Sequence, residues 1–232
     1  MVKHRPFLIP LKEEFHMSGN HNEPENAVHT GTTTLALKCK DGVVMATDQR
    51  ATMGNLIANS NVQKVYPISD YIGMTISGLV GDAQLMIRFM KSEIAIYEME
   101  KGARISVQTA ATMLGSVIRQ GFYLGPLVAG VDKTGGHVFS VDGAGGVLED
   151  EYSSSGSGSI VAYGVLETLY KPGLTKDKAI DVAISGINAA RRRDNYSGDG
   201  ILVLYIGPDG YEWVSEEEVR SRVKALGFNY PQ

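Results

Sequence analysis

Three threonines behind a glycine are the residues of this sequence that could most directly carry out chemistry. Thr32, Thr33 and Thr34 follow Gly31, where a polar stretch gives way to regular apolar patterning. A threonine hydroxyl is a poor nucleophile at neutral pH, but a free α-amino group has a pKa of roughly 7.7 to 8 and can act as its base. A cut between Gly31 and Thr32 would place both groups on one residue. The run also suits an ordinary strand start, because threonine is common in strands.

Gly31 is a suitable residue for the other side of such a cut. If Thr32 cut the chain itself, its hydroxyl would have to reach the carbonyl carbon of Gly31, and glycine adopts the contorted backbone that this requires most readily. We therefore interpret the Gly31–Thr32 bond as a candidate cleavage site.

Other common catalytic patterns find little support. A serine or cysteine triad needs a histidine base, and only His137 remains if the residues before Thr32 are removed. His137 and the single cysteine, Cys39, lie within alternating patterns, so we interpret both as strand residues. The stretch Gly78-Leu-Val-Gly81-Asp82 lacks the third glycine of a dinucleotide fingerprint, and the chain has no Gly-Lys-Ser/Thr phosphate loop.

The chain divides at the same point into a leader and one domain. Residues 1–31 hold four of the five histidines and show neither helical nor strand periodicity. Residues 32–232 have a length that fits a single domain.

Apolar residues alternate along several short segments and recur at steps of three and four along others. Alternation predicts strands at residues 33–39, 43–47, 64–68, 71–77, 127–131, 137–141, 147–152, 201–206 and 211–214. Steps of three and four predict helices at residues 79–97, 107–118, 160–170 and 175–193. A last helix is expected after a capping box of Ser215 and Glu218.

The order of these elements predicts the fold class. Consecutive strands are joined by hairpins rather than by helical crossovers, which argues against a doubly wound parallel sheet. A strand as apolar as residues 201–206 is expected to be buried on both faces. We therefore predict an α+β fold of four layers, an αββα sandwich in which two antiparallel sheets pack together and helix pairs flank them.

The composition indicates a globular protein without a nucleic-acid partner. Hydrophobic residues make up 43% of the chain, and 22 basic against 26 acidic side chains give a net charge of −4. No surplus of positive charge is present to neutralise a phosphate backbone. One cysteine can form neither an internal disulfide nor a zinc cluster, which favours a reducing, cytoplasmic location. The apolar patch at residues 7–11 is too short for a signal peptide, and no segment approaches the roughly 18 apolar residues of a membrane span.

From Thr30 to about Leu226 the sequence resembles the catalytic β subunits of the proteasome, particularly those of archaeal type. The resemblance implies the N-terminal nucleophile hydrolase form of the αββα sandwich. It also implies that residues 1–31 are a propeptide removed by self-cleavage and that residues 32–232 are the catalytic β domain. It is carried by blocks that occur in one order along the chain: Gly31-Thr-Thr-Thr34, Met45-Ala-Thr-Asp-Gln-Arg50, Gly73-Met-Thr-Ile-Ser-Gly-Leu-Val-Gly-Asp82, Gly156-Ser-Gly-Ser159, Tyr163-Gly-Val-Leu166, and Arg193-Asp194 followed by Ser197-Gly198.

The resemblance assigns roles to individual residues. The nucleophile of the family falls on Thr32, its acid on Asp48 and its lysine on Lys64. An ammonium group close to the amine and hydroxyl of the threonine lowers their pKa values, and a carboxylate keeps that ammonium charged and oriented. A polar cluster around the terminal nitrogen is implied at Ser157, Asp194 and Ser197. The backbone N–H that stabilises the oxyanion is implied at Gly78.

Without the resemblance, these residues have ordinary interpretations. An aspartate or lysine beside a strand is usually a solvated surface residue, and the serine-rich segment 153–159 has the composition of a flexible loop.

The resemblance also implies how substrate is held. Arg50 matches a position that braces the active site. The pocket for the residue before the cut is implied at four uncharged residues: Ala51, Val62, Ile76 and Val80. Cleavage is therefore expected after large hydrophobic residues.

The implied function is that of an endopeptidase acting on unfolded polypeptides, with no cofactor and no metal. The implied partners are sibling β subunits in a seven-membered ring, proteasome α subunits and, through these, an unfolding ATPase. Two alternatives remain. One is a noncatalytic structural β subunit of the stacked proteasome rings, which would typically lack the threonine, lysine or acid. The other is another N-terminal nucleophile hydrolase, an amidohydrolase, which would act on small amides.

Overall fold

A computed structural model of the protein describes residues 31–229. The predicted propeptide therefore lies outside the described residues, apart from Gly31. Within the described part the chain forms two five-stranded antiparallel sheets and a separate two-stranded hairpin.

The first strand of the domain, β1, is an inner strand of the first sheet. Its strand order is β10-β1-β2-β11-β12, with neighbours antiparallel throughout. Its strands are β1 (Thr34–Cys39), β2 (Gly42–Asp48), β10 (Tyr152–Ser155), β11 (Ile201–Gly207) and β12 (Gly210–Trp213). Because β1 lies between two partners, the residues just before it are held at one end of the sheet.

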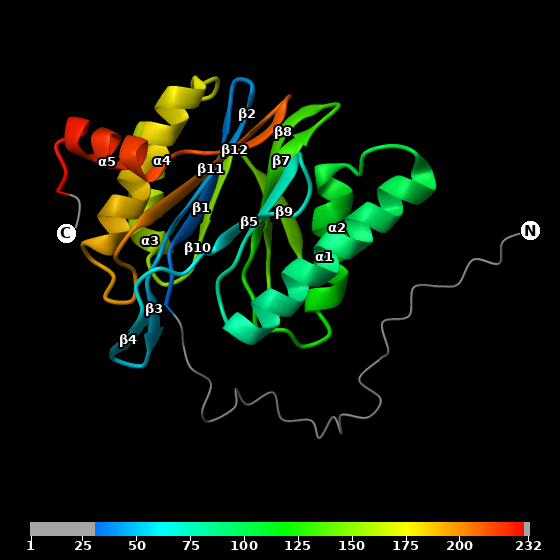
Figure 1. The fold of residues 1–232 in the computed structure, drawn as a ribbon, viewed down its shortest axis with the longest axis horizontal. Helices are drawn as coiled ribbons and strands as arrows, with labels where there is room; N and C mark the ends of the chain where they lie inside the picture. The colour runs from blue at the N-terminus through cyan, green and yellow to red at the C-terminus, as the bar shows by residue number, and fades with distance from the viewer. Residues whose placement is uncertain (1–30, 230–232) are drawn as a thin grey trace, which may run out of the picture.

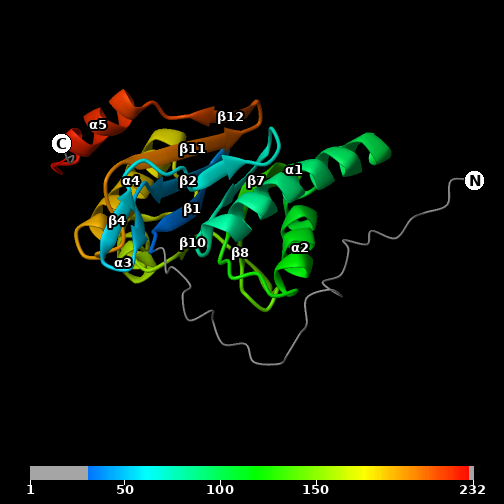
Figure 2. The same ribbon diagram turned by 60° about the horizontal axis from the view of Figure 1, so that its bottom comes forward.

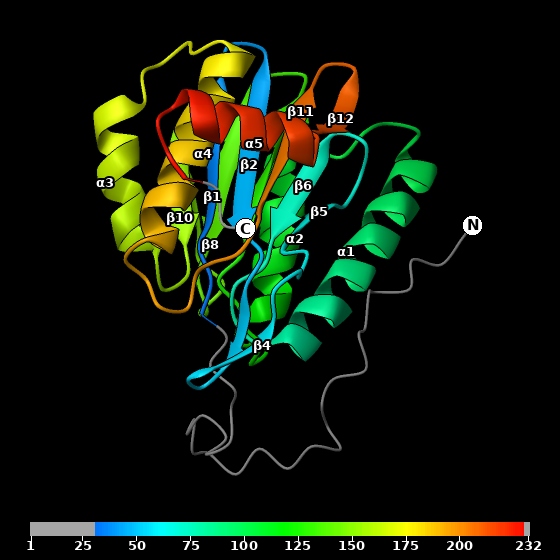
Figure 3. The same ribbon diagram turned by 60° about the vertical axis from the view of Figure 1, so that its left-hand side comes forward.

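The second sheet follows the chain order β5-β6-β7-β8-β9 and is also antiparallel. Its strands are β5 (Val65–Pro67), β6 (Ile72–Thr75), β7 (Leu127–Asp132), β8 (Gly135–Val141) and β9 (Val147–Asp150). The separate hairpin consists of β3 (Ala51–Met53) and β4 (Leu56–Asn59). Figure 3 shows this hairpin projecting from the end of the molecule where β1 begins.

Helices cover the outer face of each sheet, as Figure 1 shows. On the second sheet lie α1 (Val80–Lys101) and α2 (Val107–Ile118), whose buried side chains join those of β6 and β8 in one apolar cluster. On the first sheet lie α3 (Ser159–Leu169), α4 (Lys176–Arg191) and α5 (Glu216–Ala225). Figure 2 shows how the chain passes from β12 into α5, which packs against α4 and β11.

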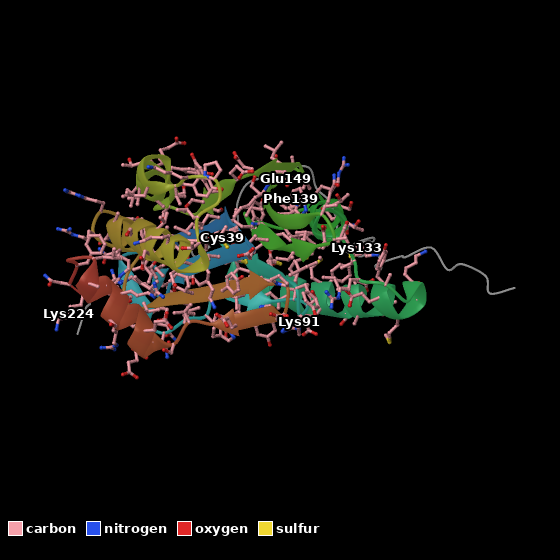
Figure 4. All side chains as sticks on the ribbon, turned by 90° about the horizontal axis from the view of Figure 1, so that it is seen from above. Cys39, Lys91, Lys133, Phe139, Glu149 and Lys224 are labelled. Atoms are coloured by element: carbon pink, nitrogen blue, oxygen red, sulfur yellow. The ribbon has the colours of Figure 1, made fainter. Side chains whose placement is uncertain are left out.

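The period of two along the strands explains the layers. In β1, Leu35 and Leu37 point to the helices of the first sheet, whereas Ala36 points to the second sheet. The space between the sheets is filled by apolar side chains from both, among them Met45, Leu127 and Leu204. Side chains fill the layers throughout, and Figure 4 shows Phe139 of β8 within the molecule and Lys224 of α5 at its surface. The predicted αββα sandwich is therefore confirmed.

Helix starts follow the capping residues of the sequence. The Ser215 hydroxyl accepts a hydrogen bond from the Glu218 N–H at the start of α5, which is the N-cap half of the predicted capping box, while the Glu218 carboxylate binds Arg222. Ser106 and Thr175 cap α2 and α4 in the same way.

Some predicted strands were wrong in their extent, and one hairpin was not predicted. The single strand expected at residues 147–152 is divided at Glu151, and its halves join different sheets, β9 the second and β10 the first. The hairpin of β3 and β4 was not predicted, because β4 is exposed along its whole length and β3 buries only Thr52, so no buried face imposes alternation. The strands expected at 64–68 and 71–77 are shorter, at Val65–Pro67 and Ile72–Thr75.

A chain of buried hydroxyl groups joins the two sheets close to the start of β1. Thr75 on β6 accepts a hydrogen bond from the Leu127 N–H at 3.0 Å and donates one to the Thr34 hydroxyl on β1 at 3.2 Å. Neither Thr34 nor Thr75 has any exposed surface. The strand that leads to Gly78 is thereby fixed against the strand that begins after Thr32.

We predict that Thr75→Val destabilises the fold, because valine keeps the shape but leaves the buried Leu127 N–H without its acceptor. Such a loss costs about 1–3 kcal/mol. The measurement is the free energy of unfolding in denaturant, with Thr168→Val on the exposed face of α3 as control. Equal stability of the two variants would contradict the prediction.

Candidate active site

Thr32 lies buried at the entry to β1, with 4% of its surface exposed. Its main-chain nitrogen donates a hydrogen bond to the Ser157 hydroxyl at 3.1 Å, and that hydroxyl donates to Asp194 Oδ2 at 2.6 Å. The nitrogen is a peptide N–H while residue 31 is attached, and a cut at this bond would convert it to an amine. The serine-rich segment is thus packed against Thr32 rather than being a free loop.

The close fit of this segment depends on glycine. Gly156 has a φ of +96°, and a Cβ added to it would lie 2.1 Å from the Thr32 carbonyl oxygen. Gly31 is confined as well, since an added Cβ would lie 1.8 Å from the Tyr196 Cβ. Distances below 3.0 Å exclude a side chain unless the backbone moves.

Lys64 and Asp48 form a buried ion pair next to Thr32. Lys64 Nζ lies 2.8 Å from Asp48 Oδ1, with 5% of the lysine side chain and none of the aspartate side chain exposed. Burial lowers the pKa of Lys64 below its ordinary value, and the charge and hydrogen bond of Asp48 act in the opposite direction. Lys64 is therefore a lysine whose proton is held less tightly than usual and whose charge depends chiefly on the Asp48 carboxylate.

Four donors hold the Asp48 carboxylate. Besides Lys64 Nζ, Asp48 Oδ1 accepts the Thr33 N–H at 2.9 Å. Asp48 Oδ2 accepts the N–H groups of Arg50 at 3.1 Å and Gly198 at 2.9 Å. Because a buried carboxylate is stable only when its oxygens are hydrogen-bonded, these donors fix its position.

Thr33 connects this ion pair to the polar cluster on the loop after α4. Its N–H binds Asp48, and its hydroxyl lies 2.6 Å from the Ser197 hydroxyl. The Ser197 hydroxyl donates to Asp194 Oδ2 at 2.6 Å, the same oxygen that receives Ser157. All the polar residues predicted around Thr32 therefore belong to one hydrogen-bonded network.

A pocket opens beside Thr32. Its lining includes three of the four predicted residues, Ala51, Val62 and Ile76, together with Gly78. The fourth, Val80, is the first residue of α1, and its side chain lies outside the described part of the structure. The lining adds residues that the prediction did not contain: Gln63, Lys64, Tyr66, Ser77 and Gln84.

Gly78 has a backbone that suits only glycine. Its φ is +118°, and an added Cβ would lie 2.1 Å from the Tyr123 carbonyl oxygen. The residue is thus held against the loop after α2 at the edge of the pocket.

Arg50 is paired to an aspartate that the sequence analysis did not single out. Its guanidinium binds Asp199 through Nε at 3.0 Å and Nη2 at 3.4 Å. The sequence contains a signal for Asp199, because a charged residue stands between two glycines in Gly198-Asp199-Gly200. Tyr66 and Gln84 carry no comparable signal and are found only from the fold, as are the contacts of Thr33 with Asp48 and Ser197.

Fold and site together define the class of protein. A four-layer αββα sandwich, with a buried threonine entering an inner strand beside a lysine–aspartate pair, has the architecture of the N-terminal nucleophile hydrolases.

Comparison with known proteins identifies the family within that class. The family model described as proteasome subunit matches residues 28–206. Proteins named proteasome subunit beta are similar to the chain: that of Methanobrevibacter smithii is 42% identical over 203 residues, 87% of this chain and 100% of that protein. That of Thermoplasma acidophilum is 43% identical over 206 residues (87% and 97%), and that of Methanosphaerula palustris 46% over 201 residues (84% and 95%).

The chain belongs to the proteasome subunit family, and its resemblance to β subunits is confirmed. Members of this family are subunits of a multi-subunit proteasome assembly, and the family is generally proteolytic. Among the helices of residues 31–229, none is long and apolar enough to cross a membrane.

We predict that Asp48→Asn lowers the pKa of Lys64 further. The carboxylate favours the ammonium form, so its removal makes the charged form less stable and the proton leaves at lower pH. The measurement is a titration of the Lys64 side chain by 13C NMR. Lys38, which pairs with Glu149 and Glu151, serves as the control whose pKa stays constant. A Lys64 pKa that is unchanged or higher in the variant would contradict the assignment.

Proposed function

We propose that this chain is a threonine endopeptidase, in which Thr32 is the nucleophile once residues 1–31 have been removed. The observation that carries the proposal is the position of Thr32, whose main-chain nitrogen is bonded to Ser157 while the Lys64–Asp48 pair lies beside it. A threonine with both a free amine and a nearby ammonium has what nucleophilic catalysis requires.

Self-cleavage would come first. The Thr32 hydroxyl attacks the carbonyl carbon of Gly31, the bond from that carbon to the Thr32 nitrogen breaks, and the nitrogen takes up a proton. The resulting ester is hydrolysed by water, which releases residues 1–31 with a carboxylate end and leaves Thr32 with a free amine. The contacts of Gly31 with Tyr196 and Ser157 support this step, because they leave no room for a side chain at residue 31.

Peptide hydrolysis would repeat the same chemistry on a substrate. The Thr32 amine accepts the proton of the hydroxyl, the hydroxyl oxygen attacks the peptide carbonyl, and the Gly78 N–H stabilises the oxyanion. The peptide C–N bond then breaks, the departing amine takes the proton from the Thr32 ammonium, and the acyl group stays on Thr32 as an ester. The amine then assists water in hydrolysing the acyl-enzyme ester. The Lys64 ammonium keeps the pKa of the Thr32 groups low, and Asp48 holds that ammonium in place. Every group in these steps belongs to the chain, so the reaction itself requires no metal and no cofactor.

The proposal extends to the assembly. We infer that the chain forms seven-membered rings with sibling β subunits, stacked against rings of α subunits in the cytoplasm. An unfolding ATPase acting through the α subunits would supply unfolded polypeptides. A noncatalytic structural β subunit is the main alternative, and it is disfavoured because Thr32, Lys64 and Asp48 are all present and in one network. An amidohydrolase is disfavoured by the similarity to proteasome β subunits.

We predict that the chain from an active particle begins at Thr32. Thr32→Ala removes the nucleophile and abolishes both self-cleavage and peptide hydrolysis, whereas Thr32→Ser keeps a hydroxyl and retains part of both. Intact-mass analysis and N-terminal sequencing provide the measurement. A full-length chain in an active wild-type particle, or an active Thr32→Ala particle, would contradict the prediction.

We predict further that the pocket prefers large hydrophobic side chains. Its predicted walls of Ala51, Val62 and Ile76 can bury apolar groups at about 0.8 kcal/mol per methylene. They offer no partner to a desolvated carboxylate or ammonium, and the Lys64 ammonium at the pocket is already paired with Asp48. Fluorogenic peptides that differ only in the residue before the cut are the measurement, with faster cleavage after Leu, Phe or Tyr than after Lys or Asp.

The pocket assignment has a matched test in two isoleucines, Ile72 on β6 and Ile76 just beyond the end of that strand. Ile76→Ala should widen the pocket and shift the preference towards larger aromatic residues. Ile72→Ala makes the same truncation on β6 under the helices, and it should leave the preference unchanged. An equal shift in both variants, or a wild-type preference for charged residues, would show that the pocket is elsewhere.

A further inference from the structure

Asp199 stands out in the loop between α4 and β11 because of its backbone. Its φ is 61°, and it is the single residue other than glycine with a positive φ within residues 31–229. Left-handed backbone is costly for most residues, and such positions are retained where the surrounding structure enforces them. The neighbours of Asp199 are Gly198 and Gly200, so the chain places a carboxylate in a turn that would suit a third glycine.

The Asp199 carboxylate holds the Arg50 guanidinium against the Gly198 backbone. The two side chains pair at 3.0 and 3.4 Å and are only 22% and 23% exposed. A Cβ added to Gly198 would lie 2.2 Å from the Arg50 Cζ, so the guanidinium rests directly on this residue. Arg50 Nη1 also donates to the Asn195 carbonyl oxygen at 3.4 Å, in the same loop.

This pair joins the two segments that hold the second oxygen of Asp48. One donor to Asp48 Oδ2 is the Arg50 N–H, and the other is the Gly198 N–H. The side chain of Arg50 is bound to Asp199, the residue next to Gly198. The ion pair thus closes a ring of contacts around the carboxylate that orients Lys64.

We propose that Asp199 is a positioning residue for catalysis, acting through Arg50 and Gly198 on Asp48 and thereby on Lys64. The proposal rests on the proposed function, since it needs Lys64 to serve Thr32. Loosening of Asp48 makes the Lys64 ammonium less stable, because this carboxylate is the main group that favours the charged form. The ammonium would then lose its proton at lower pH.

Asp199→Asn isolates the charge from the backbone conformation, because asparagine tolerates left-handed φ well. In the assembled particle we expect kcat for a fluorogenic peptide to fall roughly 10- to 100-fold, the range that corresponds to losing a hydrogen bond between charged groups. The alkaline limb of the pH–kcat profile should move to lower pH. If asparagine prevents assembly, Asp199→Gly removes the carboxylate while keeping the backbone freedom and takes its place.

A double-mutant cycle with Arg50→Gln tests the route of action. If Asp199 acts through Arg50, the double variant should be no slower than Arg50→Gln alone, because the interaction is already lost. Asp177→Asn, which removes the exposed partner of Arg222, is the control and should match the wild type in kcat and pH profile.

The outcomes separate this inference from the proposed function. An Asp199 variant with the kcat and pH profile of the wild type would overturn the inference. A lower kcat without a shift of the alkaline limb would also overturn it. So would a double variant in which the kcat losses of the two single variants multiply. An inactive wild type, or one as active as Thr32→Ala, would overturn the proposed function instead.

Discussion

The buried ion pair of Lys64 and Asp48 is the interaction on which the rest of the site depends. Moving two charges out of water is costly, and their attraction offsets that cost only when the geometry is good and the remaining lone pairs are satisfied. Asp48 meets this condition with four donors: the Arg50 N–H of its own segment, and Thr33, Lys64 and Gly198 from three other segments of the chain. Each segment must therefore arrive at one place, and this requirement constrains the fold around Thr32.

The αββα sandwich brings these segments together at one end of the first sheet. Thr33 enters β1, Asp48 ends its neighbour β2, and the loop that carries Gly198 leads into β11, the next strand. Lys64 arrives from the start of the second sheet and crosses the interface between the sheets. The Thr75–Thr34 hydroxyl contact ties that interface beside the site. The packing of the two sheets thus aligns Thr32 with the pocket and with Gly78.

The sequence predicted the fold class, and its motifs located most of the site, for identifiable physical reasons. Buried strands and amphipathic helices leave strong periodic patterns, so the layers followed from them. The exposed strand β4 and the short strand β3 leave no such pattern, and the division of residues 147–152 depends on which sheet each half meets. The partners of Thr33 and Asp199, and the pocket positions of Tyr66 and Gln84, depend on contacts between distant segments, which no local pattern encodes. The roles of Thr32, Asp48 and Lys64 came from family resemblance rather than spacing.

Catalysis by Thr32, supported by the Lys64 ammonium, can be tested directly on the assembled particle. A β-lactone acylates an activated hydroxyl, so the particle is treated with a β-lactone and the adduct is located by peptide mass spectrometry. We expect a single ester on the hydroxyl of Thr32 at the start of the mature chain, and no adduct in Lys64→Ala. An adduct on Ser157 or elsewhere, or equal labelling of Thr32 without Lys64, would contradict it.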